Sequence, residues 1–400
     1  MSMTRSRKLL ALVAIVAVLA MVATGCAKKA ATTETAKAVT VTIGIGAPLT
    51  DGAVALGKGM VRGTNLAVKQ ANESQELKDL GITLETVEGD DKGDPTTGGN
   101  VATQFTSNPS LVGVMGHLNS GVTRVAVKIY NQADVVQVSP ANTAVDLTTM
   151  GNENYFRVCT VDSVQGPFAA DYAFKEAGKK AAFVVDDSTV YGVGLADEWA
   201  KQFEADGGKV LGREKTGDKD TDFKALVTKI KSTNPDIVYY GGIYNSGALL
   251  SKQVKEGGLA VPVMSGDGSF DPEWIKLAGI DAAEGDMASN VGLPIDLMPK
   301  GQDFMAAYKA EFPGEVPAAY DAYSYDAANV IIKAIIVAAK EVGVDKVATT
   351  EGKKAIIAAV GKTDFEGVTG QVKFDSKGDT LNKTITVYAV KGGKWVPVSK

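Results

Sequence analysis

The chain has 400 residues, of which 45% are hydrophobic and 22% charged, with a formal net charge of −5. This is the composition of a globular protein and excludes a disordered, collagen-like or coiled-coil chain. One histidine and two cysteines are too few for a Cys/His zinc site, so we expect no metal and no other cofactor. No basic block points to nucleic acid, and we expect no such partner.

The first residues have the features of an export signal. A cationic start precedes the apolar run Leu9–Val22, which is shorter than the roughly 20 residues of a membrane span but suits a signal peptide. Ala23-Thr24-Gly25-Cys26 resembles a bacterial lipobox, although Ala23 stands where leucine is usual. We predict a lipoprotein signal peptide over residues 1–25, lipidation of Cys26 and a tether over 26–39. An ordinary cleaved signal peptide is the alternative.

From Val39 onward, short β-branched runs alternate with amphipathic stretches. Strands are predicted at Val39–Ala47, Ile82–Val87, Leu111–Gly116, Val135–Val138, Ala181–Val185, Lys209–Arg213, Ile237–Tyr240 and Val261–Ser265. Helices are predicted at Gly63–Ser74, Thr96–Ser107, Val122–Asn131, Gly166–Glu176, Leu195–Asp206, Phe223–Ser232 and Gly247–Glu256. The alternation indicates an α/β fold with parallel sheets, and a reset near residue 160 indicates two lobes.

The segments after the second set of strands follow a different pattern. The helices Gly301–Phe312 and Tyr325–Val342 have no strands of their own, so we expect them to return to the first lobe. Gly370–Phe374 and Thr384–Val390 are predicted as antiparallel edge strands.

Motifs for catalysis and cation binding fail when they are tested position by position. His117 is the only histidine, and no G-x-S-x-G elbow accompanies Ser120, so we expect a loop histidine held by local backbone. The acidic run Asp218–Asp222 lacks the glycine and glutamate of a calcium loop and is predicted to be a turn. The run Asp90–Asp94 is predicted to be a polar loop with a helix-capping aspartate. We therefore assign no catalytic residue and no metal ligand.

Two loops, in contrast, suit an anionic ligand. Residues 116–121 follow the predicted strand Leu111–Gly116, and residues 139–143 follow Val135–Val138. The carboxyl ends of parallel strands meet at one sheet edge, where helix N-termini attract a carboxylate. Ser120 and Thr143 add hydroxyl donors there, with helix capping as the alternative role of each.

Several fragments then match one family in order and spacing. They are Ile43–Gly52, Asp90–Pro95, Val114–Ser120, Ser139–Thr143, Asp162–Gly166, Asp187–Gly192, Asp222–Phe223, Asp236–Gly242 and Tyr323–Ala327. In these fragments the chain resembles the type I periplasmic binding proteins for branched-chain amino acids, the leucine/isoleucine/valine receptors of ABC transporters. The resemblance implies a Venus-flytrap clamp of two Rossmann-like lobes joined by a three-strand hinge. Lobe one would comprise residues 40–161 and 291–366, and lobe two residues 162–290 and 367–400.

The resemblance also implies the roles of individual residues. Ser120 and Thr143 would hold the ligand carboxylate, while the Ala141 carbonyl and the Asp267 carboxylate would hold its ammonium. Tyr191 would close over the ligand from the second lobe. The remaining expected ligand-binding residues are Leu118, Asn119, Tyr320, Ile243 and Leu56. An Asx-type turn is the alternative role of Asp267.

The sidewalls of the pocket depart from the family pattern. Leu56 and Ile243 stand where amino-acid binders of the family often have tyrosines, so the side-chain pocket would differ in shape.

The predicted function is therefore that of an exported solute-binding lipoprotein of an ABC importer. It would be a monomer that binds an amino acid, with a branched-chain or aliphatic side chain as the leading choice, and delivers it to a membrane permease with its ATPase subunits. A ligand sensor of the same fold, or an ABC receptor for amides, urea or aromatic acids, is the alternative. An exported α/β hydrolase is disfavoured by the missing motifs.

Overall fold

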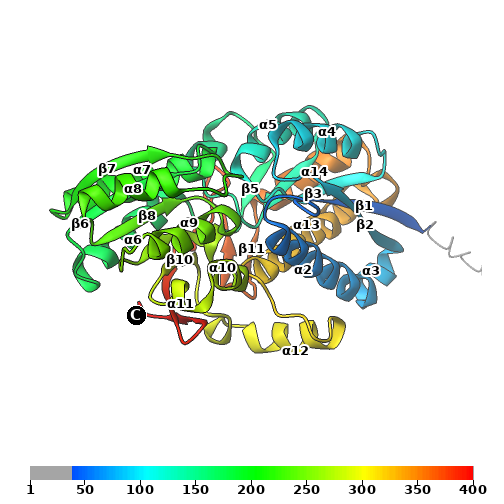
Figure 1. Cartoon of the computed structure of the whole chain (residues 1–400). Coiled ribbons are helices and arrows are strands. Elements are labelled where there is room, and N and C mark those ends of the chain that lie inside the picture. Colours follow the sequence, from blue (N-terminus) through cyan, green and yellow to red (C-terminus); the bar gives the residue numbers. More distant parts are fainter. Residues whose placement is uncertain (1–37, 400) are drawn as a thin grey trace, which may run out of the picture. The chain divides into compact units, whose positions relative to one another are not determined.

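The computed structural model describes residues 38–399, which belong to one compact unit (Figure 1). The predicted signal peptide and Cys26 lie outside the described residues. Within the described part, two central sheets organise the fold, and each is built around alternating strands and helices.

The first sheet is entirely parallel, with the strand order β2-β1-β3-β4-β5. Its strands are β1 (Val39–Ala47), β2 (Ile82–Asp90), β3 (Leu111–Gly116), β4 (Val136–Ser139) and β5 (Tyr155–Arg157). Every residue of β3 and β4 is buried, as expected of strands covered by helices on both faces. The four strands predicted for this lobe are confirmed, and the three-residue β5 is an addition.

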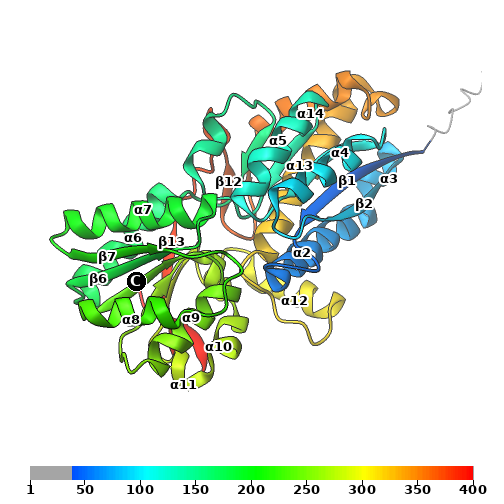
Figure 2. The same cartoon turned by 45° about the horizontal axis from the view of Figure 1, so that its top comes forward.

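The second sheet has the order β14-β13-β10-β9-β8-β6-β7. Its strands are β6 (Ala181–Asp186), β7 (Lys209–Lys215), β8 (Ile237–Gly241), β9 (Val263–Ser265), β10 (Met287–Val291), β13 (Ile385–Lys391) and β14 (Lys394–Pro397). The first five are parallel, whereas β13 runs antiparallel to both β10 and β14. The red C-terminal strands therefore lie with the green lobe (Figure 2).

The prediction that Thr384–Val390 forms an edge strand was wrong. β13 lies between two strands, and β14 is the edge strand. Six of the seven residues of β13 are buried, which agrees with a position inside the sheet. Gly370–Phe374 contributes β12 (Gln371–Lys373), which pairs antiparallel with β11 (Asp364–Glu366) in a separate small sheet.

Helices surround both sheets. Those of the first sheet are α2 (Val54–Glu73), α3 (Gln75–Leu80), α4 (Pro95–Thr106), α5 (Ser120–Gln132), α12 (Gly301–Glu311), α13 (Asp321–Val342) and α14 (Thr350–Gly361). Those of the second are α6 (Asp162–Asp171), α7 (Val190–Ala205), α8 (Lys224–Thr233), α9 (Tyr244–Glu256), α10 (Pro272–Ala278) and α11 (Ile280–Ala283). A π-helical turn over Tyr172–Glu176 extends α6, and short 3₁₀ turns occur at Val145–Thr149, Asp267–Ser269 (η3), Ile295–Leu297 and Val344–Lys346.

Helix α13 carries the chain back to the first lobe, as predicted. It contacts α2, α14 and β3, and a Cβ on Gly113 of β3 would lie 2.8 Å from the side chain of Ile331. Among the described helices, α13 alone has the length and mean hydropathy of a membrane span, but 72% of that stretch is buried inside the fold. Its apolar composition therefore serves a core position.

Candidate ligand-binding site

A small cavity lies where the carboxyl ends of the two sheets meet. Leu56, Leu118, Asn119, Ser120, Ala141 and Tyr320 line it from the first lobe, and Tyr191, Ile243, Asp267 and Gly268 from the second. The structure thus brings together all the residues that the resemblance implied except Thr143, which is fully buried two residues beyond Ala141. The cavity sits at the strand ends, where open α/β sheets bind ligands.

Asp267 is the acidic centre of this cavity. It begins η3 directly after β9, and only 1% of its surface is exposed. Its Oδ1 accepts hydrogen bonds from Gln165 Nε2 at 2.8 Å and from the Tyr191 hydroxyl at 2.9 Å, and the Tyr320 hydroxyl donates to its Oδ2. Burial raises the pKa of Asp267, and these neutral donors offset the shift only in part.

No lysine or arginine forms an ion pair with Asp267 in the part of the chain that the structure describes. A buried carboxylate without a cation costs several kcal/mol. An ammonium group entering the cavity would supply the missing opposite charge.

The two loops of the first lobe are tied to each other by buried hydrogen bonds. Ser139 Oγ accepts from the backbone N–H groups of Ala141 and Asn142 at 3.2 and 3.0 Å. Asn142 Nδ2 donates to the Leu118 carbonyl at 2.7 Å. The loop with Ser120 and the loop with Thr143 therefore form one rigid support.

Arg157 of β5 supports the loop that contains Thr143. Its side chain is fully buried, and Nη1 donates to the carbonyls of Asn142 at 3.0 Å and Ala144 at 2.7 Å. Asp379 neutralises the guanidinium at 2.5 Å from Nε. This role of Arg157 could not be predicted from the sequence, because a lone arginine on a short strand carries no motif.

Donors and acceptors remain free on the first-lobe side. Ser120 is the first residue of α5, so the N–H groups of that first turn face the cavity end of the helix. The Thr143 hydroxyl and the Asn119 side-chain oxygen are buried and have no hydrogen-bond partner among the described residues. A helix N-terminus with adjacent hydroxyls suits a carboxylate.

The prediction that local backbone satisfies His117 was wrong. Its ring is fully buried, with Nδ1 2.7 Å from Asp91 Oδ2 and Nε2 2.9 Å from the Tyr130 hydroxyl. Ser120 forms no hydrogen bond with this ring. The prediction for the neighbouring acidic loop is confirmed, because Asp94 accepts from Thr97 N and caps α4.

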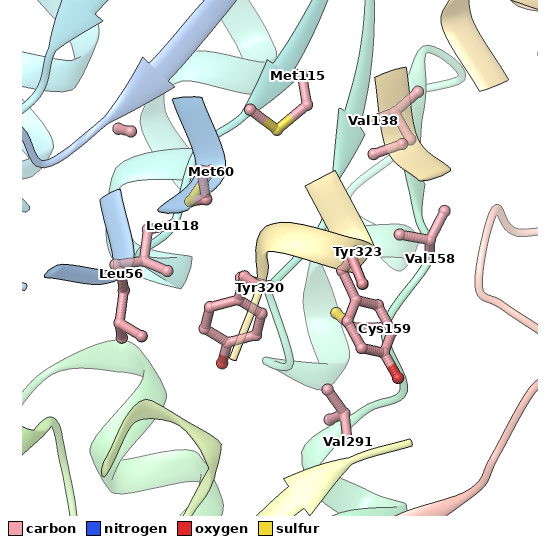
Figure 3. Close-up of a cluster of buried hydrophobic side chains, with 14 of the residues drawn as sticks. Leu56, Met60, Met115, Leu118, Val138, Val158, Cys159, Val291, Tyr320 and Tyr323 are labelled. Atoms are coloured by element: carbon pink, nitrogen blue, oxygen red, sulfur yellow. The ribbon is translucent and has the colours of Figure 1, made fainter. Parts of the chain in front are cut away.

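Apolar side chains close the remaining wall. Leu56 of α2, Leu118 and the Tyr320 ring lie in one buried cluster, together with Tyr323 and Cys159 (Figure 3). Ile243, at the N-terminus of α9, faces them from the second lobe. This wall offers no charge, as an aliphatic side chain requires.

The cavity is narrow in this arrangement. Its volume is about 20 Å³, room for about one water molecule. The Tyr320 hydroxyl contacts Asp267 across the cavity, and the backbone N–H of Ala55 in α2 donates to the Tyr244 hydroxyl of α9 at 3.1 Å. A larger ligand can enter only when the two lobes move apart and Tyr320 releases Asp267.

Known proteins match this chain over most of its length. Residues 40–394 match the family model described as "Periplasmic binding protein". A Brucella abortus protein named Leu/Ile/Val-binding protein homolog 1 is 33% identical over 341 residues, covering 85% of this chain and 87% of its own length.

Solved structures match as well. A leucine-binding protein of Thermotoga maritima superimposes with a TM-score of 0.80 at 28% identity, covering 90% of this chain and 98% of that one. A branched-chain amino acid binding protein of Streptococcus pneumoniae, solved with isoleucine, has a TM-score of 0.79 at 26% identity, with coverages of 90% and 100%.

Proposed function

This chain belongs to the periplasmic binding protein family, and from that premise we propose that it binds an aliphatic α-amino acid for an ABC importer. The family is one of extracytoplasmic substrate-binding proteins, and the role assigned here is binding without catalysis. The relatives named for leucine, isoleucine and valine support the choice of ligand.

The observation that carries the proposal is the buried Asp267, which has no cationic partner among residues 38–399. The opposite side of the cavity offers Ser120 and the N-terminus of α5. A zwitterion satisfies both ends at once, its ammonium on Asp267 and the Ala141 carbonyl and its carboxylate on Ser120 and Thr143. Such charge-assisted hydrogen bonds are roughly twice as strong as neutral ones.

Binding would proceed by opening and closure. The lobes separate, and Tyr320 releases Asp267, because the closed cavity holds only about one water molecule. The amino acid docks on the first-lobe loops, which are already held by Ser139 and Arg157. Tyr191 and Asp267 then close over it from the second lobe, and the ligand stabilises this closed form for recognition by a permease.

The side-chain pocket favours a branched aliphatic group. Leu56, Leu118 and Ile243 give three aliphatic walls, and none carries a donor that a polar side chain would need. Leu56 and Ile243 replace the tyrosines common in the family, which leaves more room around the end of the side chain.

Anchoring completes the proposed role. The apolar run Leu9–Val22 followed by Ala23–Cys26 supports export with a lipid on Cys26, which would keep the monomeric receptor near its permease. Cys26→Ser should release the protein from the membrane fraction into the soluble extracytoplasmic fraction. Retention of the variant on the membrane would contradict the lipid anchor.

A thermal-shift screen tests the proposed ligand. The chain from residue 27 onward is first partly unfolded and dialysed to remove ligand acquired in the cell. Leucine, isoleucine and valine are then compared with polar amino acids, amides, urea and aromatic acids. Ligand at about 100 times its dissociation constant adds roughly 2.7 kcal/mol of stability. We expect the aliphatic amino acids to raise the melting temperature, and a shift with amides or aromatic acids alone would overturn the proposal.

A further inference from the structure

A second buried carboxyl group, Asp162, lies close to the cavity without lining it. It is the first residue of α6, where the chain crosses from the first sheet to the second. The residue is 1% exposed, and neither carboxyl oxygen has a hydrogen-bond partner among the described residues. An ionised carboxylate in that position costs several kcal/mol, so the neutral form is strongly favoured.

Asp162 connects the carboxylate-binding loop with the closing lobe. Its backbone N–H donates to the Thr143 carbonyl at 2.8 Å, and the Thr143 hydroxyl lowers the pKa of the carboxyl although no well-formed hydrogen bond joins the two side chains. On the other side, a Cβ on Gly194 of α7 would lie only 3.2 Å from Asp162 Oδ2. The same helix carries Tyr191. The carboxyl is therefore enclosed by both lobes.

The charged and titratable groups around Asp162 come from four elements. They are Arg157 of β5, Asp267 of η3, Glu198 of α7 and Tyr239 of β8. Burial is the main cause that raises the pKa of Asp162 to about 8; Asp267 and Glu198 act in the same direction, and the Thr143 hydroxyl and Arg157 act against it. Arg157 is already paired with Asp379. A ligand ammonium that keeps Asp267 ionised would thus favour a neutral Asp162.

We propose that Asp162 is a positioning residue that takes up a proton when the lobes close and donates its O–H to Thr143 Oγ1. The Thr143 O–H is thereby directed toward the ligand carboxylate. Both hydroxyl and carboxyl lack partners in the structure, so a side-chain rotation satisfies two buried groups at once. This inference rests on the proposed binding function.

The sign of the pH dependence follows from linkage. The proposal requires that water reach Asp162 in the open form, where its pKa would return toward the ordinary value near 4. A carboxyl whose pKa is raised in the closed form favours closure below the open-form pKa, and this preference is lost as the pH rises through about 8. Affinity should fall by up to tenfold per pH unit over that interval and stay level above it.

Calorimetry with leucine tests the inference. Titrations of the chain from residue 27 onward, at about pH 6 and 7.5 in buffers of different ionisation enthalpy, count the protons taken up on binding. We expect Asp162→Asn to bind leucine with one proton fewer than the wild type and with a flatter pH profile, because its carboxamide donates without titrating. Asp171→Asn, at the exposed end of the same helix, should match the wild type.

Equal proton counts in the wild type and Asp162→Asn would overturn the inference while leaving amino-acid binding intact. Failure of the wild type to bind any amino acid would instead refute the proposed function. If Asp162→Asn does not fold, infrared difference spectroscopy of the wild type replaces it. Leucine binding at neutral pH should produce the C=O band of a newly protonated carboxyl, and absence of that band would contradict the inference.

Discussion

The two halves of the site solve the problem of burying charge in different ways. On the first-lobe side, Arg157, Ser139 and Asn142 fix the loops with satisfied hydrogen bonds, and the groups left without partners are neutral. On the other side are two buried carboxyls without a cation: Asp267 accepts hydrogen bonds from neutral donors only, and neither oxygen of Asp162 has a partner among the described residues. The loops that would bind the ligand carboxylate are held in place before the ligand arrives. Asp267, in contrast, would gain an opposite charge only from the ligand ammonium.

Removal of Asp267 should have the largest effect on binding. Asp267→Asn leaves the ammonium of the ligand buried without an opposite charge, a loss of about 2–5 kcal/mol or more, which corresponds to at least about 30-fold in Kd. Calorimetry with leucine measures the loss. The same variant should melt at a higher temperature than the wild type without ligand, because it removes an unpaired buried carboxyl. Normal leucine binding by Asp267→Asn would contradict the claim that Asp267 binds the ligand ammonium.

Replacement of Arg157 should destabilise the protein, because this side chain supports the loops that would bind the ligand carboxylate. Arg157→Met leaves Asp379 unpaired and removes the hydrogen bonds to the two loop carbonyls, and we expect destabilisation by about 3–5 kcal/mol in urea unfolding. The exposed pair of Arg124 and Asp146 provides the matched control, since Arg124→Met should cost no more than about 1 kcal/mol. An equal loss of unfolding free energy in the two variants would show that Arg157 does not support the loop.

The unliganded protein should lose stability as the pH rises from about 4 through about 6. Burial raises the pKa values of Asp187, Asp271 and Asp321 to about 6. Each raised pKa favours the folded state below the unfolded pKa and loses that contribution as the pH passes the folded pKa. Melting temperatures at about pH 5.5 and 8.5 check this. A higher melting temperature at the alkaline value would contradict it.

Tyr320→Phe should have the smallest effect of these variants, and it should strengthen leucine binding instead of weakening it. The Tyr320 hydroxyl occupies Asp267 Oδ2, the atom that the ligand ammonium needs, so its removal should tighten leucine binding by up to about tenfold. Tyr325→Phe, which removes an exposed hydroxyl bonded to Gln70, is the control and should change nothing. Tenfold weaker binding by Tyr320→Phe would mean that the hydroxyl contacts the ligand instead.

Periodicity located the strands well but placed the starts of the site helices too late. Helix α5 begins at Ser120 rather than Val122, α7 at Val190 rather than Leu195, and α13 at Asp321 rather than Tyr325. Ser120 and Tyr191, in the first turns of α5 and α7, line the cavity, and the first turn of α13 contains the polar residues Asp321 and Ser324, so these turns lack the apolar repeat that marks the rest of each helix. The site residues could therefore be predicted from the family resemblance but not from hydrophobic periodicity.

The supporting residues could not be predicted for a related reason. Arg157 and His117 make their contacts with Asp379, Asp91 and Tyr130, which are distant in sequence. Only the fold brings such partners together. Asp162 and Gln165 belong to the fragment Asp162–Gly166, which matches the family. Nothing in their spacing, however, indicates that both side chains are buried beside Asp267.

A comparison of leucine with two analogues tests the central claim most directly. Calorimetry would compare leucine with 4-methylpentanoate, which lacks the ammonium, and 3-methylbutylamine, which lacks the carboxylate. If the two halves each bind one charge of a zwitterion, both analogues should bind at least about 30-fold more weakly than leucine. Binding of either analogue as tightly as leucine would contradict the account, because one half of the site would then contribute nothing.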